Sequence, residues 1–142
     1  MKKIKCLLLS PVDIPKSIEV DSENIEELQK IIDCRCFTMV RRTIGGKEYD
    51  LWIDDEGLFK QEEDGTILAS GICSNAYEIL AGNMLIANNK GDEMDSLNEE
   101  DFMTIMANLV CVDEDTKIGY DTNIGHCEML FKKEGVILRY EV

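Results

Sequence analysis

The sequence is short of basic residues, of histidine and of long apolar runs. Its 142 residues include 15 Lys and Arg against 29 Asp and Glu, with one histidine, one tryptophan and two prolines. The formal net charge of -14 would repel nucleic-acid phosphates and anionic membranes over most of the surface. No apolar stretch reaches the roughly 18 residues of a membrane span, and the one near the N-terminus is too short for a signal peptide. We therefore expect a soluble, cytoplasmic protein that binds neither nucleic acid nor membrane directly.

Catalytic motifs are also missing from the sequence. There is no Walker loop, no GxSxG, no HExxH and no GxGxxG. The one histidine, His126, stands next to Cys127, but neighbours on a strand point to opposite faces, so the pair does not indicate a nucleophile with its base. We predict a non-enzymatic protein with no catalytic residue and no cofactor.

The six cysteines do not form a recognisable framework. They show no paired spacing and no CxxC knuckle: Cys6, Cys34, Cys36, Cys73, Cys111 and Cys127. A zinc tetrahedron would need Cys34 and Cys36 to meet the distant His-Cys pair at 126–127. Free thiols that serve as small apolar residues are the better interpretation. We therefore predict neither disulfides nor a metal site.

Four strand-like stretches stand out in the first ninety residues. Residues 2–9 are β-compatible and apolar. Two β-rich runs then flank Gly45 and Gly46, which tolerate the positive φ of a hairpin turn. The short apolar run at 84–87 is also typical of a strand.

Two amphipathic helices are predicted as well. Asp21 or Ser22 is the predicted N-cap of the first helix. Ser96 is the predicted N-cap of the second, because Ser96 and Glu99 match the S-x-x-E pattern of a capping box. Apolar residues recur at helical spacing in both, at Ile25, Leu28, Ile31 and Ile32 and at Phe102, Ile105, Met106 and Leu109. A shorter helical turn is predicted at 75–80. The sum is an α+β fold, a mainly antiparallel sheet with two helices packed on one side.

The chain shows no repeat, no low-complexity segment and no linker long enough to separate two domains. We predict that residues 1–142 form a single α+β domain. Two β-rich segments flank the turn at 132–135. They predict a C-terminal β-hairpin extension at 112–142.

Carboxylates crowd into the stretch AGNMLIANNKGDEMDSLNEEDF, residues 81–102. Six are present, Asp92, Glu93, Asp95, Glu99, Glu100 and Asp101. The spacing does not match an EF-hand loop, although an irregular divalent-cation site stays open. The last three fall in the first turn of the predicted second helix, where the dipole favours negative charge by about 0.3 to 1 kcal/mol each. We interpret these acids as solvated residues that begin a helix.

Four segments occur in an order that resembles a known family: IEELQKII, DDEGLFK, YEILAGNMLIAN and SLNEEDF. Over roughly residues 20–110 the chain is similar to a small domain family of unknown function. That family is carried by phages, plasmids and other mobile elements, mainly of Gram-positive bacteria. The resemblance implies an accessory protein in the host bacterial cytoplasm that modulates host defence by binding. It supplies no catalytic residue.

Positive charge and aromatic character meet on the predicted hairpin. The candidate ligand-binding residues are Arg41, Arg42 and Trp52, joined by Arg35 and Lys47. An indole can stack on a base and guanidinium groups can bind phosphate, so this patch suggests a small nucleotide-like ligand. In the mobile-element context, the preferred function is sequestration of a nucleotide immune signal. A homo-oligomer that builds the binding cleft is left open.

A second hypothesis uses the acidic surface. The protein would be an acidic DNA mimic that inhibits a nucleic-acid-binding host protein, such as a defence protein. Independently of this second hypothesis, the structural alternative to the ligand-binding patch is that Arg41 and Arg42 pair with nearby carboxylates and Trp52 covers the edge of the core. Salt distinguishes the two hypotheses, because screening weakens binding between charged surfaces more than binding in a pocket.

Overall fold

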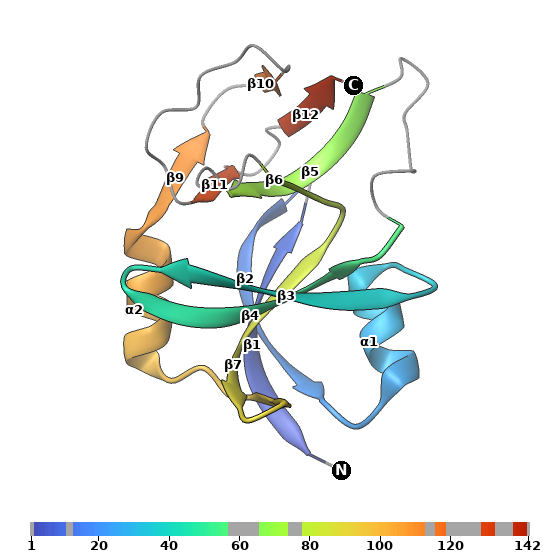
Figure 1. Ribbon diagram of the computed structural model, residues 1–142, viewed down its shortest axis with the longest axis vertical. Helices are drawn as coiled ribbons and strands as arrows, with labels where there is room; N and C mark the ends of the chain where they lie inside the picture. Colours follow the sequence, from blue (N-terminus) through green and yellow to red (C-terminus); the bar gives the residue numbers. More distant parts are fainter. Residues whose placement is uncertain are drawn as a thin grey trace.

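A computed structural model shows how these elements are arranged (Figure 1). It describes residues 2–10, 13–56, 66–73, 78–112, 116–118, 129–132 and 138–141, and the side chains of residues 2–10, 15–56 and 82–108. The predicted α+β class with a mainly antiparallel sheet is confirmed.

A sheet of six strands forms the centre of the described structure. Its path runs β2-β1-β7-β4-β3, β8 pairs with β7, and all of these pairs are antiparallel. The strands are β1 (Lys3–Ser10), β2 (Asp13–Asp21), β3 (Phe37–Ile44), β4 (Lys47–Asp54), β7 (Met84–Lys90) and β8 (Glu93–Asp95). The predicted first strand, hairpin and strand at 84–87 are confirmed. Strand β2 is additional, since Pro15 and its charged neighbours hide it, and an edge strand tolerates proline.

Six further strands of the described residues lie outside this sheet. They are β5 (Thr66–Cys73), β6 (Glu78–Ala81), β9 (Leu109–Val112), β10 (Thr116–Ile118), β11 (Met129–Lys132) and β12 (Leu138–Glu141). The segment Glu78–Ala81 pairs with β5, so the helical turn expected at 75–80 is a strand in its described part. Strand β11 runs parallel to β9, whereas β12 pairs with β5 and β10. The arms of the predicted C-terminal hairpin therefore belong to different sheets, because each finds a partner from earlier in the chain.

The central sheet buries both of its faces. Along β7, Met84 and Ile86 belong to one core cluster, while Leu85 and Ala87 belong to the other. Helix α2 (Glu99–Ala107) packs Ile105 into the first cluster. Helix α1 (Ile25–Ile32) packs two buried residues into the second. The expectation that both helices share one side is therefore wrong, because alternate residues of the same strands face different helices.

Helix α1 begins one turn later than its predicted cap. Asn24 is the N-cap, and its side chain accepts a hydrogen bond from the backbone N–H of Glu27. Asp21, which was predicted to cap the helix, instead accepts from the N–H groups of Lys2 and Glu23. Asp33 ends the helix in the left-handed conformation, with φ 57°.

Helix α2 also begins later than predicted. The capping box is formed by Asn98 and Asp101, two residues beyond the predicted pair of Ser96 and Glu99. The hydroxyl of Ser96 instead accepts a hydrogen bond from the backbone N–H of Lys5. The predicted apolar stripe is confirmed only in part, because Met106 is 40% exposed and the last of its four positions starts β9.

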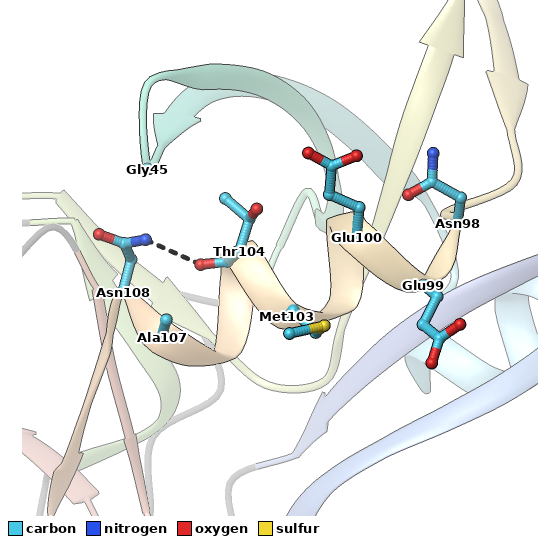
Figure 2. A pocket seen from close by; sticks show the side chains of 8 residues that line it. All are labelled: Gly45, Asn98, Glu99, Glu100, Met103, Thr104, Ala107 and Asn108. Atoms are coloured by element: carbon cyan, nitrogen blue, oxygen red, sulfur yellow. Dashed lines mark hydrogen bonds between the residues drawn. The ribbon is translucent and has the colours of Figure 1, made fainter.

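The turn between β3 and β4 approaches helix α2 closely (Figure 2). A Cβ atom added at Gly45 would lie 2.5 Å from the side-chain nitrogen of Asn108 and 2.6 Å from the Cγ2 of Thr104. Its neighbour Gly46 also has a positive φ, but a Cβ there would meet nothing within 4 Å. Gly45 therefore serves both the turn and the docking of the helix.

We predict that Gly45→Ala lowers the free energy of unfolding more than Gly46→Ala does. At Gly46, alanine costs only the about 1 to 2 kcal/mol that a residue with a Cβ atom requires to adopt the left-handed backbone conformation. At Gly45 the clash with α2 adds about another 1 to 3 kcal/mol. Urea denaturation of both variants measures the difference, and equal losses would contradict the close approach of the turn to the helix.

Candidate functional site

The structure separates the five candidate ligand-binding residues. Trp52 and Arg41 lie on the sheet face that packs against α1, by the alternation of their strands. The same alternation places Lys47 and Arg42 on the opposite face. Arg35 lies in the segment between α1 and β3. The residues therefore do not converge on one anion-binding surface.

Arg41 is engaged by a buried carboxylate. Its Nε donates to Asp50 Oδ1 at 2.9 Å, and its Nη2 donates to the carbonyl oxygen of Gly91 at 3.1 Å. The side chain of Asn89 lies 3.4 Å from the same Oδ1. Asp50 is 1% exposed, and the hydrogen bond to it raises the pKa of Arg41. A buried carboxylate needs such donors, so this guanidinium is committed to the fold.

The other cations also have internal partners. Arg35 donates three hydrogen bonds to the carboxylate of Glu56, the shortest at 2.7 Å. This hydrogen bonding raises the pKa of Arg35. The Nη1 of Arg42 donates to the carbonyl oxygen of Arg41 at 2.6 Å. Lys47 donates to Asp101 at 2.7 Å and lies 5.4 Å from the ring centre of Tyr49.

Asp101 receives four hydrogen bonds and is 3% exposed. Its Oδ1 accepts from Lys47 Nζ at 2.7 Å and from the Tyr49 hydroxyl at 3.0 Å. Its Oδ2 accepts from Asn88 Nδ2 at 2.6 Å and from the backbone N–H of Asn98 at 3.0 Å. The carboxylate therefore joins β4, β7 and the start of α2. The interpretation of this acid as a solvated residue is wrong, although Glu99 and Glu100 beside it are exposed.

These contacts set the ionisation of the group. Burial acts to raise the pKa of Asp101, but the donors from Lys47, Asn98, Asn88 and Tyr49 together hold it below its ordinary value. Burial and the hydrogen bond to this carboxylate raise the pKa of Tyr49. The pair is therefore a carboxylate bound to a neutral phenol, which is a structural arrangement rather than an acid poised for proton transfer.

Trp52 lines a cleft of about 320 Å³. We call this the Trp52 cleft, and its apolar walls are Trp52, Phe37, Ile25, Leu28 and Met94. The rings of Trp52 and Phe37 meet edge to face, with centroids 5.8 Å apart. The indole Nε1 is buried and has no hydrogen-bond partner among the described residues. The indole ring of Trp52, rather than its N–H group, is therefore accessible from the cleft.

Charged residues surround the Trp52 cleft. Glu23, Asp92 and Glu93 bring three carboxylates, and Lys2 brings one ammonium. Lys2 donates to Glu93 Oε2 and to the carbonyl oxygen of Met94, both at 3.3 Å. Lys2, Glu23 and Phe37 were not predicted from the sequence as site residues, whereas Asp92 and Glu93 were named only among the acids for which a divalent-cation site stayed open. The hairpin register offered a signal for Phe37. It stands opposite Asp54, which makes it the diagonal neighbour of Trp52 on the same face.

A second hollow, which we call the α2 groove, runs along the outer side of helix α2 (Figure 2). It measures about 760 Å³ and is lined by Gly45, Asn98, Glu99, Glu100, Met103, Thr104, Ala107 and Asn108. Met103 is 68% exposed here. Neither the thiols nor the cations of the described residues line this groove.

Nucleophilic and metal chemistry find little support in the described part of the chain. Burial raises the pKa of Cys6 to about 12, so its thiol stays protonated. Cys34 and Cys36 form no disulfide within the described residues, and the zinc partners considered at 126–127 lie outside those residues. Within the described ranges, no three His, Cys, Asp or Glu side chains gather in a way that could hold a metal ion. Neither α1 nor α2 has the length and apolar character needed to span a bilayer.

Fold and site together define an α+β domain in which ion pairs join neighbouring strands and tie helix α2 to the sheet. Its aromatic Trp52 cleft has an acidic rim. Comparison with known proteins gives the family. Residues 4–117 match the model of a domain of unknown function, DUF3846, and the chain belongs to that family. No curated protein and no solved structure matches the chain.

We predict that Asp101→Asn lowers the free energy of unfolding by about 2 to 4 kcal/mol at neutral pH, since an amide cannot accept from all four donors. The lowered pKa means that the carboxylate stabilises the fold above its ordinary pKa, and that this contribution is lost as the pH falls through the folded-state pKa. The difference between wild type and variant should therefore shrink in acid.

Urea denaturation at several pH values measures this difference. The control is Glu100→Gln, an exposed acid in the same turn, which should change stability by no more than about 0.5 kcal/mol. Equal effects of the two substitutions, or a difference that grows in acid, would contradict the assigned role of Asp101.

Proposed function

We propose that this protein is a non-enzymatic binding protein whose acidic surface recognises a basic, nucleic-acid-binding protein partner. One observation carries the proposal. Arg35, Arg41 and Lys47, which the sequence offered for an anionic ligand, are held in ion pairs with carboxylates of the same chain. A phosphate would have to compete with those carboxylates, whereas a basic partner would not.

The distribution of exposed charge supports the same direction. Among residues with described side chains, ten exposed acids stand against seven exposed bases. Three of those bases, Lys3, Arg35 and Lys47, and two of those acids, Glu19 and Glu93, are held in ion pairs. An excess of one charge sign attracts partners of the opposite sign and speeds their association.

The genetic context that the resemblance implies belongs to this proposal. In a phage, plasmid or other mobile element, a protein of this kind would modulate host defence by occupying the basic surface of a nucleic-acid-binding host protein. Its carboxylates would stand where that protein normally receives phosphates.

Sequestration of a nucleotide immune signal is the second candidate. The observation that favours it is the Trp52 cleft, where Trp52 and Phe37 supply aromatic surface for a base. The acidic rim opposes it, because its three carboxylates outnumber its one ammonium, and the net negative charge would repel the phosphates of the same ligand.

We predict that the protein binds octalysine, a simple basic probe, and that binding depends steeply on salt. Raising NaCl from about 50 to about 300 mM should weaken the affinity by at least about tenfold, because screening acts on exposed charges. Isothermal titration calorimetry measures the affinity at each salt concentration.

The competing candidate is tested with the same protein preparation. A cyclic nucleotide at millimolar concentration should leave the melting temperature unchanged, since only a ligand that binds the folded state raises it. A clear rise with the nucleotide, together with no binding of octalysine at low salt, would reverse the order of the two candidates.

A further inference from the structure

We propose that the Trp52 cleft is the anchor point of the basic partner and takes one of its lysine or arginine side chains. The inference rests on the proposed function and assigns it a place on the molecule. The alkyl stem of the side chain would lie against the apolar walls, and its cationic head would lie among the rim carboxylates.

The walls of the cleft suit such a side chain. Trp52 and Phe37 are both partly exposed, and they form an edge-to-face pair at one side. The indole face attracts cations through its quadrupole, more strongly than the other aromatic rings do. Because the indole N–H is buried, the ring surface is what a ligand would meet. At about 320 Å³ the cleft lies at the small end of ligand-binding cavities, a size that suits a side chain.

The rim supplies the charge complementarity. Glu23, Asp92 and Glu93 are exposed, and together they exceed the single positive charge of Lys2. The ammonium of Lys2 already shows how this rim holds a cation, because it donates to both a carboxylate and a backbone carbonyl there. A second cation would meet the exposed carboxylate of Asp92 beside the Lys2–Glu93 pair, and Glu23 adds its negative charge to the same rim.

The α2 groove provides the matched comparison. It carries two exposed acids, Glu99 and Glu100, but its lining contains no aromatic residue. The double variants Glu23→Gln/Asp92→Asn and Glu99→Gln/Glu100→Gln each remove two negative charges from exposed positions. They change the net charge equally and differ only in the place of the change.

The experiment titrates octalysine into each protein at low salt and follows the emission of Trp52, the one tryptophan of the chain. We expect the emission of the wild-type protein to change on binding. Glu23→Gln/Asp92→Asn should weaken the affinity by about five- to tenfold, and Glu99→Gln/Glu100→Gln by no more than about twofold. Octalysine that is acetylated on every Nε keeps the alkyl chains of its lysine side chains but loses their positive charges, and it should not bind.

Each other outcome overturns the inference in a recognisable way. If calorimetry shows binding but the Trp52 emission stays constant and the two double variants weaken it equally, the cleft is not the anchor, while the acidic surface remains the binding surface. If the acetylated peptide binds as well as octalysine, the cleft recognises the alkyl chain of lysine rather than its positive charge, and the proposed role of the rim carboxylates is wrong. If the wild-type protein does not bind octalysine at all, the proposed function fails together with the inference.

Discussion

A carboxylate buried in a protein must receive donors, and this constraint decides where several cations of the chain go. Asp101, on one face of the sheet, is satisfied by Lys47, Tyr49, Asn88 and the backbone of Asn98. Asp50 lies on the same strand as Tyr49 but faces the opposite side, where Arg41 meets it. Each face of the sheet thus has a buried acid that is bound by the β3–β4 hairpin and its neighbours, although Oδ2 of Asp50 is buried without a hydrogen-bond partner among the described residues. Helix α2 is held in place through Asp101.

The consequence for function follows from this internal use of positive charge. The chain has many more acids than bases, and among the described residues it also engages Arg35, Arg41 and Lys47 with its own carboxylates, so fewer of the described cations remain for an anionic ligand. The indole that accompanies those cations in the sequence is separated from most of them in space and meets a rim of acids instead. The surface chemistry therefore favours cationic partners, with an aromatic cleft available to hold a basic side chain.

Local patterns predicted much of the fold. Gly45 and Gly46 between two β-rich runs indicated the hairpin, and the period of apolar residues indicated α1. The opposite placement of the helices had a signal as well, since the continuous run of residues 84–87 is typical of a strand buried on both faces. The cap of α2 was ambiguous, because Asn98 with Asp101 fits the same box pattern as Ser96 with Glu99. The partners of Asp50 and Asp101 depend on contacts between residues as many as 54 positions apart in the sequence, which local patterns do not contain.

The central claim is that the guanidinium groups of Arg35 and Arg41 are engaged by carboxylates of the same chain and do not serve as an anion-binding patch. The most direct measurement is the side-chain Nε–H resonance of Arg41 in ¹⁵N NMR spectra recorded during addition of inorganic phosphate. If Asp50 holds this group, the resonance should persist at neutral pH, protected from exchange with water, and should not move at millimolar phosphate. A signal that exchanges rapidly and shifts with phosphate would contradict the account.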